Sequence, residues 1–163
     1  MSVVLYLAAI VAANMSVAAF GPGVTIINAF WLIGLDLTLR DRLHDEWRGN
    51  VVGRMVLLIA AGGAISYVLN VNAGPIALAS TVAFTVSAAL DGLAYHFLAG
   101  YRRLVRVNGS NVVGAAADSI LFPTLAFGSL LPLIVLGQFA AKVAGGFLWS
   151  LVIHAVSVRR RAA

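Results

Sequence analysis

The chain has 163 residues, of which 61% are apolar and only 10% are charged, and its mean hydropathy is +0.98. A soluble domain carries roughly 25% charged residues, so this chain has too little polar surface to cover itself in water. The composition therefore argues against a soluble enzyme, a nucleic-acid-binding domain and a disordered tail, although the net charge is +5. The absence of cysteine excludes a disulfide framework, a thiolate metal site and a cysteine nucleophile.

Two long runs, 1–35 and 55–90, contain no charged residue. A transmembrane helix needs about 20 apolar residues, so each run is long enough for nearly two spans with a break between them. The breaks are visible at 21–23 and 70–75, where glycine, proline and asparagine interrupt the apolar sequence. Glycine and proline end helices, and proline suits the first turn of the next one.

A third stretch, 111–158, holds only two charged residues and fits two more spans, with a turn near 129–137. Ser110 or Asn111 is expected to cap the fifth helix. The sequence therefore predicts an all-α integral membrane protein in which 1–163 forms one domain of six transmembrane helices. The predicted helices lie near 2–20, 24–44, 51–70, 75–98, 111–131 and 137–157.

The basic residues predict the orientation of these spans. With six spans, ten of the eleven basic residues fall on one side of the membrane, and the opposite loops carry none. Because cytoplasmic loops are rich in arginine and lysine, both termini are expected in the cytoplasm. The protein itself is expected in the cytoplasmic (inner) membrane. The ten residues are Arg40, Arg42, Arg48, Arg54, Arg102, Arg103, Arg106, Arg159, Arg160 and Arg161.

Two aspartates inside the predicted spans are candidate site residues, because an ionisable side chain there costs about 2.5–3.5 kcal/mol and usually faces a cavity or a partner. Asp36 has Arg40 four residues later, on the same helical face. Either the two form a structural pair, or Arg40 orients a cavity carboxylate. Asp118 has no basic residue within four positions, so its partner comes from another helix or from a ligand.

Two further ionisable residues lie in the predicted fourth and sixth helices. Asp91 is either a helix-end charge near Arg102 and Arg103 or a member of a polar site. Lys142, the only lysine, either extends outward to the membrane surface or pairs across the bundle with a carboxylate.

The middle helix of each three-helix half carries an aspartate, Asp36 in the first half and Asp118 in the second. Two three-helix halves in one chain have opposite orientations in the membrane. Inverted repeats with a site at their interface are a common plan of transporters, so the sequence is compatible with a 3+3 inverted repeat.

The chain resembles the VUT family of vitamin-uptake and queuosine-precursor transporters. The resemblance is carried by Leu35-Asp36-Leu37-Thr38-Leu39-Arg40, by Leu90-Asp91, by Ser110-(x3)-Gly114-(x3)-Asp118-Ser119-(x2)-Phe122-(x4)-Phe127, and by Lys142. It spans essentially the whole six-helix core. Ala115 departs from the family, since relatives often have Asn or Gln there, and the loops of this chain are shorter.

The resemblance implies uptake of 7-deazaguanine precursors of queuosine, 7-cyano-7-deazaguanine or 7-aminomethyl-7-deazaguanine. A deazaguanine presents a ring N–H and an exocyclic amine side by side, and a carboxylate accepts both hydrogen bonds. Asp118 is expected to be this acceptor, assisted by Ser119, while aromatic rings stack on the flat base. The site residues that follow from the resemblance are Asp36, Thr38, Arg40, Asp91, Asp118, Ser119 and Lys142, with Phe122 and Phe30 as stacking candidates.

Other readings share these membrane features. One is a transporter of another vitamin or nucleobase, with partner subunits such as an ATPase. Another is a holin-like or scaffold membrane protein, which would tolerate neutral residues at Asp118 and Lys142. A membrane enzyme is disfavoured, since few acid–base groups exist beyond the aspartates and three histidines. The expected partners are a small-molecule substrate and the lipid bilayer, and a homodimer is compatible with six short helices; neither a cofactor nor a nucleic acid is expected.

Overall fold

The computed structural model describes residues 2–47 and 50–162, which fold as helices joined by short turns. Six segments are long and apolar enough to cross a membrane, which confirms the predicted all-α, six-span fold. The helices are α1 (Ser2–Phe20), α2 (Thr25–Asn28), α3 (Gly34–Glu46), α4 (Val51–Leu69), α5 (Gly74–Phe97), α6 (Arg103–Phe127) and α7 (Pro132–Ala162). One span is composite, because α2 and α3 are joined by a π-helical turn over Ala29–Ile33.

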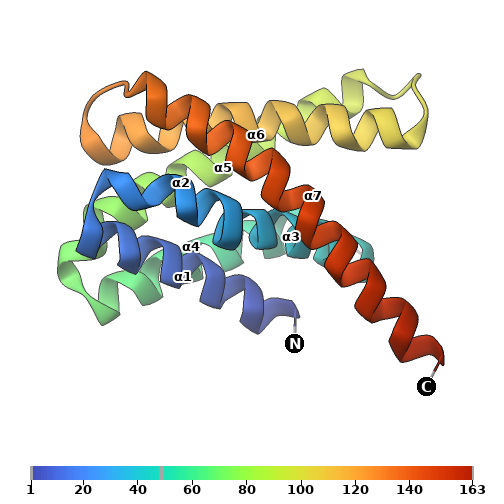
Figure 1. The fold of residues 1–163 in the computed structure, drawn as a ribbon, viewed down its shortest axis with the longest axis horizontal. Helices are drawn as coiled ribbons and strands as arrows, with labels where there is room; N and C mark the ends of the chain where they lie inside the picture. Colours follow the sequence, from blue (N-terminus) through green and yellow to red (C-terminus); the bar gives the residue numbers. More distant parts are fainter. Residues whose placement is uncertain (1, 48–49, 163) are drawn as a thin grey trace.

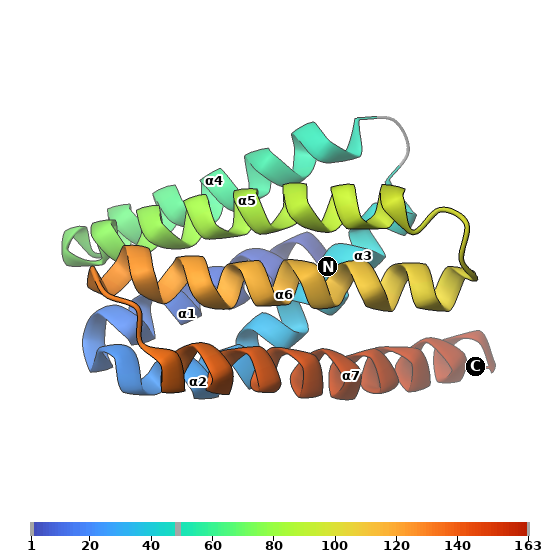
Figure 2. The ribbon, with the colours of Figure 1, turned by 90° about the horizontal axis from the view of Figure 1, so that it is seen from above.

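The spans run side by side and alternate in direction (Figures 1 and 2). The C-terminal end of α7, the helix ends that carry Arg42 and Arg54, and the α5–α6 linker with Arg102 lie toward one end of the bundle, and α1 starts on the same side of its middle (Figures 1 and 2). The turns at the opposite end carry no basic residue. This arrangement is the one that the charge distribution predicts; the membrane side of each end and the inverted repeat stay predictions.

An apolar cluster joins the N-terminal helices. Tyr6 and Ile10 of α1 pack against Leu39 and Leu43 of α3 and against α4. All six spans also expose large apolar side chains. A membrane replaces water around such a surface, so these side chains need no protein partner.

Glycine and proline set the turns as the sequence predicts. Gly21 and Gly128 follow α1 and α6 with positive φ angles of 72° and 69°, which glycine adopts as readily as negative ones. Pro75 and Pro132 lie in the first turns of α5 and α7, where a missing N–H is harmless. The predicted turn near 129–137 is too long, because Gly128 ends one helix and Pro132 already begins the next.

The fifth predicted helix begins much earlier than near 111. It starts at Arg103, and Arg102 occupies the cap position without a side-chain hydrogen bond. The predicted cap at Ser110 or Asn111 is therefore wrong. Arg106 supports this polar first part of α6, since it stacks on the Tyr95 ring at 3.7 Å and its Nε donates to the Tyr95 carbonyl at 2.8 Å.

The composite second span crosses α7 at very close range. A Cβ on Gly34 would lie 2.6 Å from the Gly145 carbonyl carbon, and a Cβ on Gly145 would overlap the Phe30 carbonyl. Across the same crossing, the Trp149 indole donates to the Trp31 carbonyl at 2.9 Å. This carbonyl lies in the π-helical turn, where the regular helical hydrogen bonding is interrupted. The crossing fixes the rotation of α7 and with it the direction of the α7 side chains.

Two neighbouring glycines give a matched test of this crossing. We expect Gly145→Ala to lower the stability of the folded protein, by about 1–3 kcal/mol as for other overpacked cores, because the added methyl group meets backbone atoms. Gly146→Ala should be tolerated, since a Cβ there meets nothing within 4 Å. Thermal unfolding of both variants in detergent measures the difference. Equal melting temperatures for the two variants would contradict the close crossing.

Candidate functional site

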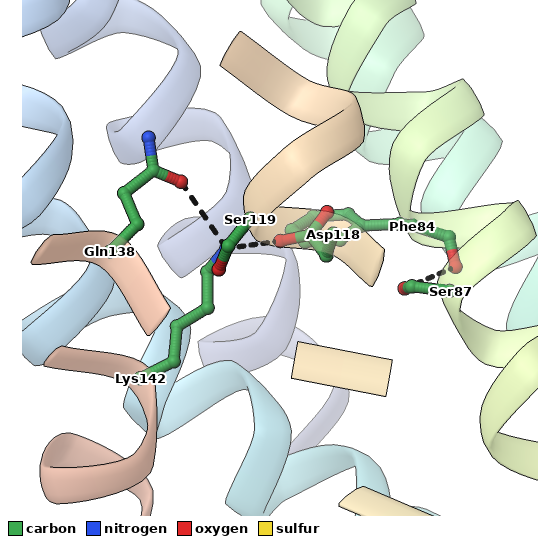
Figure 3. Close-up of polar contacts among 6 residues, drawn as sticks. All are labelled: Phe84, Ser87, Asp118, Ser119, Gln138 and Lys142. Atoms are coloured by element: carbon green, nitrogen blue, oxygen red, sulfur yellow. Dashed lines mark hydrogen bonds and ion pairs between the residues drawn. The ribbon is translucent and has the colours of Figure 1, made fainter. Parts of the chain in front are cut away.

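A buried lysine joins α6 to α7 near the middle of the bundle. Lys142 Nζ donates to Asp118 Oδ2 at 2.6 Å, to Ser119 Oγ at 2.9 Å and to the Gln138 side-chain oxygen Oε1 at 3.3 Å (Figure 3). All four residues are at most 5% exposed. The three protons of the ammonium group are therefore all donated to protein acceptors, and the pairing with Asp118 compensates the charge that burial would otherwise penalise.

The helical sequence explains how these side chains come together. Gln138 and Lys142 are four residues apart and so lie on the same face of α7. Asp118 and Ser119 lie on α6, just before the buried Pro123. Because α6 and α7 are antiparallel neighbours (Figure 2), both faces meet at the same depth. The expectation that Lys142 extends to the membrane surface is wrong; the alternative, a carboxylate partner across the bundle, is confirmed.

Two atoms of this central cluster have no hydrogen-bond partner among the described residues. They are Asp118 Oδ1 and the Gln138 amide nitrogen Nε2. Both residues line a cavity with a volume of about 30 Å³, which is room for about two water molecules. The other polar side chains of this lining are Asn14, Thr25, Asn28, Ser80 and Lys142.

A second polar cluster lies nearer the end of the bundle that carries the basic linkers. The Arg40 guanidinium lies 3.6 Å from the Asp91 carboxylate and donates to the Asn111 side-chain oxygen at 3.4 Å. Asp36 is 2% exposed, and with Arg40 and Tyr6 it lines a second cavity of about 10 Å³. The structure thus gives Arg40 two partners on other helices that the sequence pattern did not predict.

The two cavities meet at the central ion pair. Asp118, Lys142 and Phe84 line both of them. Figure 3 shows Phe84 of α5 beside Asp118. The ion pair and Phe84 therefore lie at the boundary between the two cavities.

A comparison with known families identifies the kind of protein that carries this site. Residues 8–156 match the family described as "Putative vitamin uptake transporter". The chain belongs to this family. It is therefore a multi-pass membrane protein whose family acts in transport of a small molecule and not in catalysis, as the resemblance implied. Neither a search of curated proteins nor a search of solved structures gave a match.

The transporter brings the predicted site residues into two groups and leaves two residues outside them. Asp118, Ser119 and Lys142 form the central cluster, and Phe122 lines its cavity. Ser119 itself lines neither cavity, so its role in this structure is to hold Lys142. The second group consists of Asp36, Arg40 and Asp91.

Thr38 and Phe30 line neither cavity. The Thr38 hydroxyl lies 3.0 Å from the Gly34 carbonyl and 3.3 Å from the Gly146 carbonyl, as a contact between α3 and α7. The Phe30 ring packs edge-on against Trp31, with 5.0 Å between the ring centroids. Both residues therefore contribute to the helix crossing, whereas the cavities are lined by others.

Sequence reasoning missed the amide side chains of the cavity. Asn14 donates to Ser66 at 3.1 Å, and Asn28 donates to Ser16 at 2.6 Å and to the Ala13 carbonyl at 3.3 Å. Uncharged amides cost less than charges inside a membrane, so a search for ionisable residues does not detect them. A search for every amide within the apolar runs would have found Asn14, Asn28 and Gln138.

The central ion pair gives a prediction for stability. Asp118→Asn or Lys142→Met alone leaves one buried charge without compensation, and we expect a loss of about 3–5 kcal/mol for each. The double variant Asp118→Asn/Lys142→Met removes both charges, so it should regain most of that loss. Unfolding of the purified proteins in detergent measures all four forms. If the double variant loses the sum of the two single losses, the residues do not stabilise each other.

Proposed function

We propose that this transporter imports 7-deazaguanine precursors of queuosine, 7-cyano-7-deazaguanine or 7-aminomethyl-7-deazaguanine, across the cytoplasmic membrane, with both termini in the cytoplasm. The observation that carries the proposal is a buried carboxylate, Asp118, which is 5% exposed and lines a cavity inside the bundle. Its Oδ1 has no hydrogen-bond partner among the residues that the structure describes. A buried acceptor without a partner costs free energy. A substrate that donates hydrogen bonds there recovers this loss.

The chemistry of a 7-deazaguanine fits such an acceptor. Its ring N–H and exocyclic amine form an edge of adjacent donors, and a carboxylate has about four lone-pair positions. Asp118 Oδ2 therefore has capacity for a substrate N–H in addition to Lys142. Phe122 lines the same cavity and takes the stacking role in the proposal. Phe30 no longer has this role, because it lines neither cavity.

The small volume of both cavities indicates how transport would proceed. A cavity of about 30 Å³ is too small for a two-ring base, so the helices around it have to separate before the substrate enters. Once the substrate occupies Asp118, the contact between Asp118 and Lys142 can open toward the second cavity. The contact of Arg40 with Asp91, at 3.6 Å, then forms the next polar barrier along the same route.

Queuosine formation in tRNA tests the proposed function. The chain is expressed in a bacterium that can neither make nor import the precursors, each precursor is fed at low concentration, and tRNA is analysed for queuosine. We expect queuosine with the wild-type protein and at least a tenfold decrease with Asp118→Asn, since lost hydrogen bonds to a charged acceptor are worth about 1.5–3 kcal/mol. Membrane levels are measured for every variant.

Glu46→Gln is the matched control for this experiment. It makes the same carboxylate-to-amide change at an exposed pair with Arg42, on the surface of the bundle. Queuosine should form as with the wild-type protein. If no precursor yields queuosine although the wild-type protein is present in the membrane, the substrate is another vitamin or nucleobase, or a partner subunit is needed. Full queuosine formation with Asp118→Asn would remove the proposed role of the carboxylate.

A further inference from the structure

The side-chain amide of Gln138 is held in one orientation. Its oxygen Oε1 accepts from Lys142 Nζ at 3.3 Å. The reversed amide would turn an N–H toward the ammonium group, which has only donors, so the reversed form is disfavoured. As a result Nε2 lies on the side of the amide that faces away from the ion pair (Figure 3).

This orientation leaves a buried donor without an acceptor. Gln138 is 2% exposed, and Nε2 is the one buried side-chain nitrogen among the described residues that lacks a hydrogen-bond partner. Lys142 has no proton left to offer, because all three are donated to Asp118, Ser119 and Gln138. The donor that remains available on the cavity wall in this cluster is therefore the Gln138 amide, and Asp118, whose Oδ1 is the acceptor without a partner among the described residues, lines the same cavity.

We propose that Gln138 is a specificity-determining residue that donates a hydrogen bond to a carbonyl oxygen of the substrate, while Asp118 accepts from the substrate's N–H groups. The ligand class is a flat heterocycle with a cyclic amide, in which a ring N–H adjoins a carbonyl group. For the 7-deazaguanines this inference rests on the proposed function and adds the recognition of their carbonyl oxygen. A site built around such hydrogen bonds discriminates strongly against an analogue that cannot form them, because its own buried groups then stay unpaired.

A thiocarbonyl analogue tests the carbonyl contact alone. It keeps the ring N–H and the exocyclic amine that face Asp118, but sulfur is a weak acceptor. The test measures how well 7-deazaguanine and its 6-thio counterpart compete with uptake of radiolabelled 7-cyano-7-deazaguanine. We expect the wild-type transporter to prefer the oxo compound about tenfold. Gln138→Met should abolish most of this preference, because methionine fills a similar volume without a donor.

Ser119→Ala is the matched control. It also removes an acceptor of Lys142, but it leaves the Gln138 donor in place. If Gln138 acted only by holding Lys142, both variants would change the preference alike. We expect Ser119→Ala to keep the tenfold preference for the oxo compound even where total uptake falls. An unchanged preference in Gln138→Met, or an equal loss in both variants, would overturn the inference.

A binding assay separates this inference from the proposed function. If the wild-type protein takes up no 7-deazaguanine, the purified transporter is heated with guanine or with 6-thioguanine and the shift in melting temperature is measured. Stabilisation by guanine that exceeds that by 6-thioguanine, and that disappears in Gln138→Met, supports recognition of the carbonyl group although the proposed substrate has failed. Equal stabilisation by both compounds, or none by either, overturns it.

Discussion

The structure depends on the burial of one lysine. Placing Lys142 at 2% exposure among apolar helices is tolerable only where each ammonium proton finds an acceptor and a carboxylate compensates the charge. Asp118, Ser119 and Gln138 meet this requirement, which fixes α6 and α7 in one rotation and depth. The close approach of Gly145 to the Phe30 backbone fixes the same helix less than one turn further along. Together these contacts determine what the interior of the bundle presents to a ligand.

The interior of the bundle offers a ligand one hydrogen-bond acceptor and one donor next to the Asp118–Lys142 ion pair. All three protons of the Lys142 ammonium group are donated, whereas Asp118 Oδ1 and Gln138 Nε2 have no hydrogen-bond partner in the described part of the chain. A purely structural network would satisfy its own members. A central cluster with one acceptor and one donor that have no partner among the described residues suits a protein of a transport family, since a ligand can bind to these two groups once the surrounding helices have separated.

The six spans, the turns between them and the end of the bundle that carries the arginines could be predicted from the sequence. Apolar runs, glycine–proline breaks and arginine placement follow directly from the constraints of a bilayer. The rarity of charges in the spans also marked Asp36, Asp118 and Lys142. The sequence could not predict which carboxylate meets Lys142 or that Arg40 reaches Asp91 on α5, because these contacts depend on helix rotation. That rotation is set by backbone approaches such as the one at Gly145, which have no sequence period.

Direct binding of 7-cyano-7-deazaguanine to the purified transporter tests the central claim, that the Asp118 carboxylate receives the substrate inside the bundle. Calorimetric titration compares the wild-type protein with Asp118→Asn, after both have been shown to be folded in detergent. We predict saturable binding to the wild-type protein and an affinity at least tenfold lower for the variant, which corresponds to about 1.4 kcal/mol. Equal affinities for the two proteins would contradict the account.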